Sequence, residues 1–280
     1  MKIARNDEGF LVEHPDGGWI PVDRLGLSTP DTAAVIDQRG ALAAALDRSG
    51  PGGEVDVRTL RHPIVRPGKV LGIGLNYMDH IRETGSKVPE RPVLFAKFPN
   101  SLNDPYGDVV VDSGLTGQGD YEAELAVVIG ARTHRVSAEK ALGAVFAYTV
   151  ANDVSARDCQ VVDRQLSRSK SFDTFCPIGP WLTTADVVAD PQQLAIRSWV
   201  NDEPRQNSST KEMLFPVAEL IAFLARGMTL EPGDVLLTGT PHGVGFAMDP
   251  PRFIVPGDVV RCEVEGLGVI ENRVVGPTGG

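Results

Sequence analysis

Cysteine is scarce in this sequence of 280 residues, which contains only Cys159, Cys176 and Cys262. Three scattered cysteines are too few for a disulfide framework or a zinc site, and they fit a reducing cytoplasm, so we expect small buried thiols. No apolar run approaches the roughly 20 residues that a membrane-spanning helix needs. The first residues contain no apolar stretch, so we expect no signal peptide. These absences predict a cytoplasmic protein without a membrane partner.

Positive charge is also in short supply, because 27 lysines and arginines face 37 acidic residues and the formal net charge is −10. This balance argues against a nucleic-acid partner or an anionic membrane surface. Apolar residues make up 42 % and charged residues 23 %, which is ordinary globular composition and excludes a disordered chain. The 30 glycines and 21 prolines favour many turns and short strands over a helical bundle.

The first part of the chain is predicted to form a small separate unit, residues 1–60. A turn rich in Pro and Gly between two short apolar runs indicates a hairpin over residues 10–22. Thr29 is the expected N-cap of a helix, which ends before the Gly-Pro-Gly-Gly sequence at 50–53. The remainder, residues 61–280, is expected to form the catalytic domain.

That second domain is predicted to consist mainly of strands separated by turns. Pro-Gly-Asp sequences at 232–234 and 256–258 each precede an apolar run, and Pro and Gly at the central positions suit a type II turn that leads into a strand. Convincing helices are few and are expected over 137–146 and 216–227. The fold class is therefore predicted to be α+β and rich in β, with a small N-terminal α/β extension.

The strongest chemical signal is an acidic pair at the start of the apolar run 123–129. Alternate side chains of a strand share a face, so Glu122 and Glu124 are expected to point the same way. Two buried carboxylates repel, and a hard divalent cation would compensate them, whereas a solvated sheet face would need no compensation. Asp153 follows another apolar run and is either a third ligand or a turn or cap residue. Three carboxylates suit Mg²⁺ or Mn²⁺ better than zinc.

A second signal lies in the polar segment after the apolar residues 70–73. His80 and Glu83 are three residues apart, so on a helix they would be neighbours. A carboxylate beside an imidazole raises its basicity and fixes its orientation, as a general base for water requires, although an ordinary exposed pair has the same spacing. Gly74 and Gly85 flank the segment and suit a mobile lid.

Three further polar clusters indicate little when taken singly, namely 156–160, 168–173 and the Gly-rich turn 237–245. The last is not a phosphate loop, because it lacks the Gly-Lys-[Ser/Thr] ending. Taken together, however, all these segments resemble the fumarylacetoacetate hydrolase family, in its branch of acylpyruvase-like and 2-hydroxyhepta-2,4-diene-1,7-dioate isomerase-like members. The matching motifs appear in the family's order over about residues 66–275, at 73–83, 120–130, 151–158, 170–180 and 238–245.

The resemblance implies a fold and an assembly. The catalytic domain would be the family's mixed β-roll or β-sandwich, usually as a homodimer. The first 60 residues are similar to the small N-terminal extension of many bacterial members. Two positions depart from the family: Ser169 stands where glycine is expected, and His242 stands where a small residue is commoner. His242 either reaches the pocket or lies on the surface.

The resemblance also assigns roles to single residues. Glu122, Glu124 and Asp153 match the metal-binding acids, which hold one Mg²⁺ or Mn²⁺ per subunit. The catalytic residues would be His80 and Glu83, on a lid that orders when ligand binds, together with Lys170. The residues that match substrate contacts are Arg157, Gln160, Tyr77 and Thr240.

These assignments predict a metal-dependent hydrolase that cleaves the C–C bond of a 2,4-dioxo acid, an acylpyruvate, to pyruvate and a carboxylic acid. His80 would activate water, Arg157 would bind the carboxylate, and Lys170 would help to stabilise the pyruvate enolate that leaves. The same site suits an oxaloacetate decarboxylase, or an isomerase or tautomerase of an unsaturated 2-oxo diacid in aromatic degradation. A non-catalytic paralogue that binds metal or ligand is the remote alternative.

Overall fold

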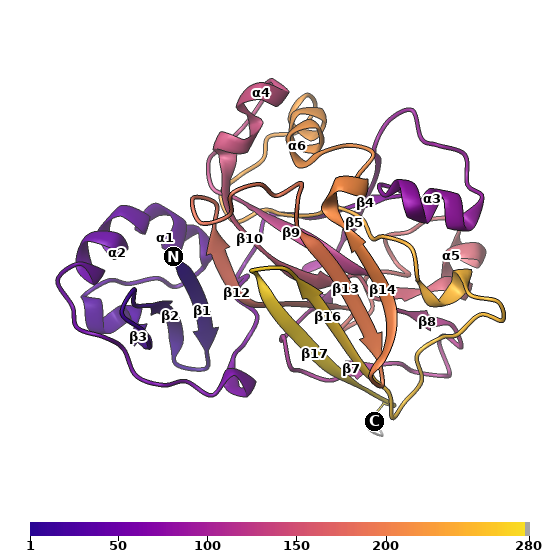
Figure 1. The fold of residues 1–280 in the computed structure, drawn as a ribbon, viewed down its shortest axis with the longest axis horizontal. Helices are drawn as coiled ribbons and strands as arrows, with labels where there is room; N and C mark the ends of the chain where they lie inside the picture. Colours follow the sequence, from indigo (N-terminus) through magenta and orange to yellow (C-terminus); the bar gives the residue numbers. More distant parts are fainter. Residues whose placement is uncertain (278–280) are drawn as a thin grey trace.

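Two large sheets dominate the computed structural model, which describes residues 1–277 (Figure 1). The ten-stranded sheet contains, in spatial order, β3 (Trp19–Pro21), β2 (Gly9–Glu13), β1 (Lys2–Asn6), β12 (Cys176–Thr184), β10 (Val145–Asn152), β9 (Ala123–Ile129), β15 (Val235–Leu237), β4 (Val70–Gly74) and β5 (Val93–Lys97), with β6 (Leu102–Asn103) beside β12. The five-stranded sheet contains β14 (Glu203–Ser209), β13 (Ala195–Val200), β16 (Val259–Val264), β17 (Gly268–Val275) and β7 (Val109–Val110). A separate pair is formed by β8 (Gly119–Asp120) and β11 (Ser155–Ala156).

The helices are short and lie between these strands. The α-helices are α1 (Thr32–Asp37), α2 (Arg39–Leu46), α3 (Met78–Thr84), α4 (Ala138–Ala141), α5 (Arg157–Asp163) and α6 (Val217–Ala225). The 3₁₀ turns are η1 (Val22–Leu25), η2 (Val57–Thr59), η3 (Pro99–Ser101), η4 (Leu142–Ala144), η5 (Thr210–Glu212) and η6 (Gly245–Ala247). Mixed sheets with few helices confirm the predicted β-rich α+β fold. Within residues 1–277, no helix combines the length and the apolar character needed to cross a membrane.

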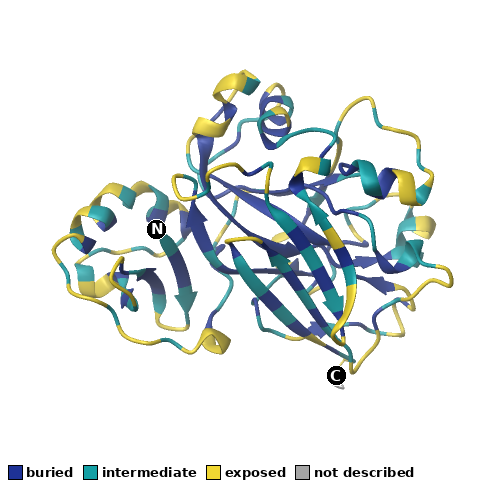
Figure 2. Cartoon of the chain, viewed as in Figure 1, coloured by how far each residue is buried: buried dark blue, intermediate teal, exposed yellow. Residues whose placement is uncertain are grey.

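Strands β9 and β10 form the centre of the molecule and are buried along their whole length (Figure 2). Leu125 and Val127 face one core, which β9 shares with the five-stranded sheet. Ala126 and Val128 face a second core, on the other side of the strand. The alternation predicted for this strand is therefore confirmed, and it places two side chains of the same parity, Glu122 and Glu124, on one face.

The N-terminal strands extend the ten-stranded sheet as a lobe at one end of the molecule (Figure 1). The predicted hairpin is confirmed, because β2 pairs antiparallel with β3. Strand β1 pairs antiparallel with β12, with Ile3 opposite Leu182. Ile3 and Leu42 pack in the same core as Val128, so this lobe shares apolar packing with the rest of the chain. The domain boundary at residue 60 stays a prediction.

Two predicted helices differ from the observed ones. Asp31, not Thr29, caps the first helix, because its Oδ1 accepts a hydrogen bond from the N–H of Ala34 at 2.9 Å. The helix expected over 137–146 ends at Ala141, because the following residues turn and join the sheet as β10, between β9 and β12. Pairing on both sides outweighs the local helical pattern.

Other local predictions are confirmed. The helix expected over 216–227 is α6, and both Pro-Gly-Asp turns lead into strands, β15 and β16. Their glycines, Gly233 and Gly257, have φ of 89° and 105°, which suits the third position of a type II turn. All three cysteines are free, with Cys176 and Cys262 buried, but Cys159 is half-buried rather than buried.

Candidate active site

Three carboxylates converge where β9 begins and β10 ends. The antiparallel pairing of these strands sets Ala151 opposite Glu124, so the residue after β10, Asp153, lies near Glu122. One oxygen from each of Glu122, Glu124 and Asp153 lies within 4.8 Å of the other two, and all three residues are buried. The convergence expected from the sequence is therefore present.

The donor set fits a hard divalent cation. Oε1 of Glu124 is buried and has no hydrogen-bond partner within the described chain. Burial, together with the neighbouring carboxylates of Asp153 and Glu122, raises the pKa of Glu124 well above its usual range. A divalent cation would satisfy the orphaned oxygen and offset the repulsion, and oxygen ligands are those that Mg²⁺ and Mn²⁺ prefer.

Two buried lysines surround this cluster. Nζ of Lys170 donates to Oε2 of Glu122 at 2.8 Å, to Oδ2 of Asp153 at 2.7 Å and to Oγ of Ser155 at 2.7 Å. Nζ of Lys97 donates to Oδ1 of Asp153 at 2.7 Å, and also to the carbonyl oxygens of Lys170 and of Phe175. Both oxygens of Asp153 are thus held by lysines.

Lys97 escaped the sequence analysis. A signal was present, since Lys97 is in phase with buried Phe95 on β5, and so points inward. The sequence analysis assigned no role to Lys97, because a lysine at the end of a short strand is more often solvated than buried.

Neighbouring charges shift the pKa of two members of the site, Glu122 and Lys170. Burial favours the neutral form of Glu122, but Lys170 and Arg157 outweigh it and lower the pKa of Glu122 to about 2. Burial likewise opposes the charge on Lys170, yet Asp153 and Glu122 raise the pKa of its ammonium group. The charged form of Lys170 is therefore favoured beside these carboxylates.

The His–Glu pair lies on α3, at the end of the molecule opposite the N-terminal strands (Figure 1). Nδ1 of His80 lies 3.2 Å from Oε2 of Glu83, and Oε1 of Glu83 accepts a hydrogen bond from the N–H of Gly243 at 2.8 Å. Burial raises the pKa of Glu83, but the bonds to His80 and to that N–H outweigh it and lower the pKa. His80 is buried, and Nε2 makes no hydrogen bond within residues 1–277.

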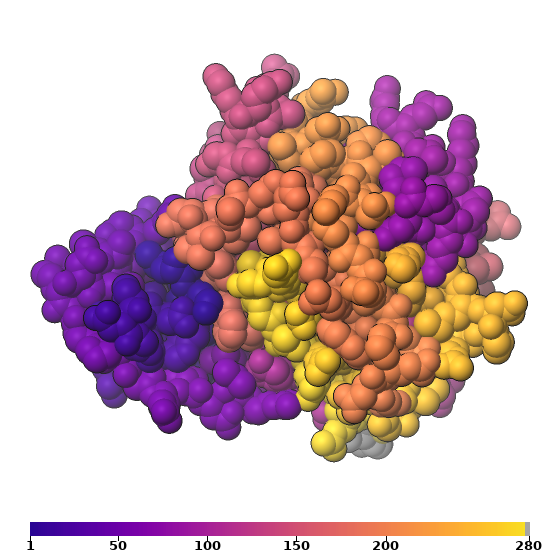
Figure 3. Space-filling view, in the orientation of Figure 1, coloured from indigo at the N-terminus to yellow at the C-terminus, as the bar shows by residue number. Residues whose placement is uncertain are grey.

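Helix α3 is docked onto the second half of the chain. Oδ2 of Asp79 accepts a hydrogen bond from Ser208, and Arg82 pairs with Glu212 at 2.9 Å. Figure 3 shows the purple segment of α3 packed against the orange segments that follow residue 200. These contacts hold α3 against the rest of the chain, and its role as a lid that orders when ligand binds stays a prediction.

Arg157 and Gln160 belong to the same constellation. Arg157 begins α5, and its Nη2 lies 2.6 Å from Oε1 of Glu122. Its Nη1 lies 3.5 Å from Oε1 of Gln160, one helical turn further on. The guanidinium therefore reaches the acidic cluster from the side of α5, as a carboxylate-binding group requires.

The remaining predicted residues differ in their surroundings. Tyr77 is fully buried, and its hydroxyl has no hydrogen-bond partner among the described residues. The Thr240 hydroxyl donates to the carbonyl oxygen of Ala123 and accepts from Nε2 of Gln206. His242 is partly exposed, with Nε2 3.3 Å from the carbonyl oxygen of Asn207. Substrate contacts by Tyr77 and Thr240 stay predictions.

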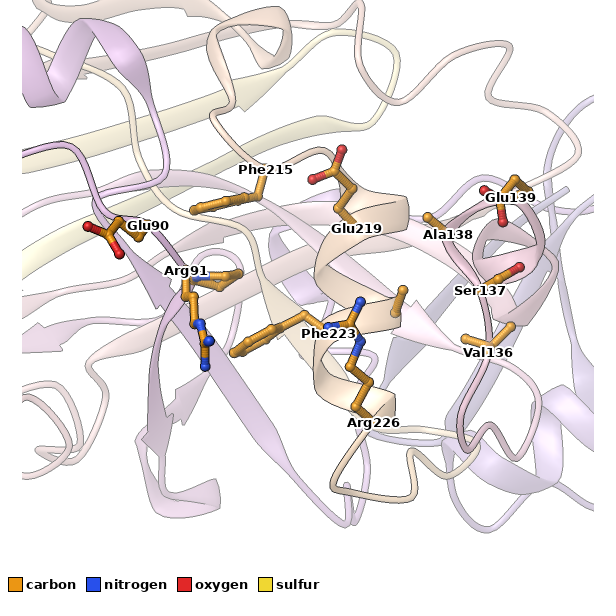
Figure 4. A pocket seen from close by; sticks show the side chains of 12 residues that line it. Glu90, Arg91, Val136, Ser137, Ala138, Glu139, Phe215, Glu219, Phe223 and Arg226 are labelled. Carbon is orange, nitrogen blue, oxygen red and sulfur yellow. The ribbon is translucent and has the colours of Figure 1, made fainter.

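A surface cavity of about 670 Å³ lies elsewhere, between residues 90–92, α4 and α6 (Figure 4). Phe215 and Phe223 line it together with Arg91 and Arg226. None of the site residues expected from the sequence borders this cavity. The chemistry of the acidic cluster therefore belongs to the buried region between β9, β10 and α3.

Known proteins are similar to this chain in sequence and in fold. A rat protein named oxaloacetate tautomerase Fahd2a, mitochondrial, is 41 % identical over 265 residues, which cover 92 % of this chain and 84 % of that protein. A maleylpyruvate hydrolase structure from Sphingobium sp. SYK-6, in complex with manganese(II) ion and pyruvate, is 31 % identical, with a TM-score of 0.81 and coverage of 99 % and 100 %. A 5-carboxymethyl-2-hydroxymuconate delta-isomerase structure from Mycobacterium smegmatis is 33 % identical, with a TM-score of 0.76 and full coverage of both chains (100 %).

A match to a family model identifies the family of this chain. The family model described as fumarylacetoacetate (FAA) hydrolase C-terminal matches residues 69–275, which is well over half of the chain. This span contains the acidic cluster, both lysines and the His–Glu pair. The chain therefore belongs to the fumarylacetoacetate hydrolase family of enzymes, as its motifs predicted.

Proposed function

We propose that this protein catalyses the keto–enol tautomerisation of a 2-oxo diacid of the oxaloacetate class. The position of His80 carries the proposal. This imidazole is buried, is near enough to the acidic cluster for its charge to act on Glu122, and is bonded to Glu83 through Nδ1. Its Nε2 is free to exchange a proton with a substrate. The name of the rat relative, an oxaloacetate tautomerase, supports this reaction over the acylpyruvate hydrolysis expected from the sequence.

The reaction needs proton movement and charge stabilisation but no attacking water. The O–H bond of the enol hydroxyl at C2 breaks and its proton would pass to Nε2 of His80. The electron pair of that bond forms the C2 carbonyl, and the electron pair of the C2–C3 double bond takes a proton at C3. His80 would deliver or remove the C3 proton, and Glu83 would stabilise the imidazolium form. Mg²⁺ or Mn²⁺ held by the three acids would supply electrostatic stabilisation of the oxyanion that develops at C2.

Other residues would bind and orient the substrate. The Arg157 guanidinium offers paired donors to a carboxylate. Lys170 and Lys97 would hold Glu122 and Asp153 in a fixed geometry, because both lysines direct their N–H groups to these acids. The docked α3 would keep bulk water away from the proton transfer.

The test follows the ultraviolet absorbance of enol-oxaloacetate after dilution into buffer, with enzyme, in Mn²⁺ and then in EDTA. We expect the enzyme to accelerate the decay in metal and EDTA to abolish the acceleration, without release of pyruvate. Release of carbon dioxide and pyruvate would instead identify a decarboxylase. An unchanged decay in both conditions would overturn the tautomerase proposal.

Acylpyruvate hydrolysis is the second candidate. The His80–Glu83 pair suits water activation, and the Sphingobium relative is named as a maleylpyruvate hydrolase. The same absorbance assay with a simple acylpyruvate separates the two, because hydrolysis yields a carboxylic acid and pyruvate in equal amounts. A non-catalytic paralogue would accelerate none of these reactions.

The assembly and location belong to the proposal as well. A homodimer is expected from the family resemblance, and light scattering after size-exclusion chromatography tests it. A cytoplasmic location stays a prediction, since the rat relative is named as mitochondrial. Fractionation of cells that produce the natural protein would decide between these compartments.

A further inference from the structure

Asp120 is a buried carboxylate that no step of the proposed reaction uses. It is completely buried and lies at the end of β8. Its Oδ2 accepts from Nε of Arg157 at 2.9 Å and from the N–H of Phe246 at 3.1 Å. Its Oδ1 accepts from the N–H of Gly245 at 2.8 Å and from the N–H of Tyr121 at 3.0 Å. Four donors thus converge on one carboxylate.

The pairing of β8 with β11 brings Asp120 and Arg157 together. Asp120 lies opposite Ser155 and Gly119 opposite Ala156, so Arg157 follows the pair directly. The N–H of Arg157 donates to the carbonyl oxygen of Gln118 at 3.0 Å, which continues the same ladder. The backbone therefore delivers the guanidinium to Asp120 before any substrate is present.

The turn 243–246 is built directly against Asp120. A Cβ at Gly245 would lie 2.7 Å from Oδ1 of Asp120 and 2.0 Å from the carbonyl oxygen of Arg252, so only glycine allows this approach. The two N–H groups that Asp120 binds, those of Gly245 and Phe246, are consecutive. Asp120 consequently fixes the backbone of the turn as well as the arginine.

Phe246 connects this arrangement to the lid. Its ring lies 4.4 Å from the guanidinium carbon of Arg157, and it meets the His80 ring edge-on, with centroids 6.0 Å apart. Gly243, in the same turn, donates its N–H to Glu83. Arg157 and the His80–Glu83 pair therefore both contact the turn 243–246.

We propose that Asp120 is a positioning residue that sets Arg157 and the turn 243–246 in one arrangement, with the guanidinium directed at the substrate carboxylate. The inference rests on the proposed function, because it takes Arg157 as the group that binds the substrate. Asp120 itself touches neither substrate nor metal ligands; it acts through Nε of Arg157 and the N–H of Phe246.

Asp120→Asn tests the proposal, because one of the two accepting oxygens becomes an NH₂ group that cannot accept. Either Arg157 and Phe246 or Gly245 and Tyr121 then lose their acceptor. We expect the Mn²⁺ affinity, measured by electron paramagnetic resonance, to stay within threefold of wild type. The affinity of the Mn²⁺-loaded protein for oxalate, a planar dianion that mimics the enolate, is expected to fall at least tenfold by calorimetry. Asp7→Asn is the matched control, since Asp7 also pairs with an arginine, Arg61, but on the surface.

A double-mutant cycle separates positioning from a general structural role. If Asp120 acts through Arg157, oxalate binding by Asp120→Asn/Arg157→Gln equals that by Arg157→Gln alone. Additive losses, or oxalate binding by Asp120→Asn within threefold of wild type, would overturn the inference. If Asp120→Asn does not fold, Arg157→Lys replaces it, because lysine keeps the charge but lacks the Nε–H. If Arg157→Lys binds oxalate with the affinity of wild type, the inference is likewise overturned.

The two proposals fail separately. A wild-type protein that binds oxalate but does not tautomerise oxaloacetate would refute the proposed function, and the cycle on oxalate binding would still report on Asp120. An active wild type whose Asp120→Asn variant keeps the KM and the oxalate affinity of wild type would refute the positioning role alone.

Discussion

Lys97 donates a hydrogen bond to Oδ1 of Asp153 at 2.7 Å, and neither side chain is exposed to solvent. The other oxygen of Asp153, Oδ2, is bonded to Lys170. A buried ion pair of this kind contributes little net stability when intact, but the loss of one partner leaves an uncompensated charge. The pair therefore makes Asp153 dependent on a residue from the far edge of the sheet, β5.

Replacing Lys97 by methionine tests this dependence. We expect Lys97→Met to lower the free energy of unfolding by about 3–5 kcal/mol, because Asp153 keeps a buried charge without one of its partners. Urea denaturation monitored by circular dichroism measures the loss. Lys2→Met is the control, because Lys2 pairs with Glu13 near the surface and should change stability by no more than about 1 kcal/mol. Equal effects of both variants would contradict the expectation.

Glu124→Gln should separate stability from metal binding. Burial and the charges of Asp153 and Glu122 raise the pKa of Glu124, so its ionised form is disfavoured in the fold. We expect the variant, in EDTA, to unfold at a higher temperature than wild type. The free energy of unfolding should rise by about 1 kcal/mol or more. Its Mn²⁺ affinity should fall more than about 100-fold, since even residues outside the ligand set change affinity 10–100-fold.

The matched control for that experiment is Glu139→Gln, which removes an exposed carboxylate on α4. It should alter neither the unfolding temperature nor the Mn²⁺ affinity. A Glu124→Gln protein that is less stable than wild type in EDTA would show that the ionised carboxylate contributes favourably to the fold.

The docking of α3 should depend on pH through Glu83. Its bonds to His80 and to the N–H of Gly243 lower its pKa, so the carboxylate stabilises the docked α3 above its unfolded pKa of about 4.5. This stabilisation is lost as the pH falls through the lower, folded pKa. We expect amide protection factors in residues 78–85 to be constant from pH 8 to pH 5 and to drop below about pH 4. Glu83→Gln should remove the step, and a step above pH 6 would refute the assignment.

His80→Gln should remove proton transfer and leave metal binding intact. Loss of a general acid–base group lowers kcat by about 10²–10⁴. Stopped-flow absorbance of enol-oxaloacetate measures the change, and His134→Gln, at an exposed histidine, is the control. Activity within about threefold of wild type, equivalent to about 0.65 kcal/mol, would show that His80 is not the proton carrier.

Much of the site could be predicted because its chemistry is local. Glu122 and Glu124 are two residues apart at the start of strand β9, and His80 and Glu83 are three apart on a helix. The repeat of each element alone therefore places each pair on one face. Lys97 and Asp120 were not singled out as site residues. Their roles depend on partners 56 and 37 residues away. The phase of β5 indicates that Lys97 points inward, but no local pattern names the partner of either residue.

Local features of the fold could also be predicted from the sequence, whereas the pairing of distant strands could not. The Pro-Gly-Asp turns correctly predicted that β15 and β16 follow them. A type II turn requires a left-handed φ at its glycine, here Gly233 and Gly257, and this requirement is local. The helix expected over 137–146 was wrong because its last residues begin β10, where Val145 pairs with Ile129 of β9, a partner that the local pattern does not contain. The union of β1 with β12 is equally non-local, since Lys2 lies opposite Thr183.

The pairing of β1 with β12 also determines how long β1 waits for its partner during synthesis. The ribosome makes Lys2 first and Thr183 181 residues later, which at about 5–20 residues per second takes on the order of ten seconds or more. During this interval the hairpin of β1 and β2 leaves the exit tunnel with the far edge of β1 unpaired. A nascent chain stalled before β12 would expose that open edge to other chains, so slow translation of the first 184 residues favours aggregation over folding.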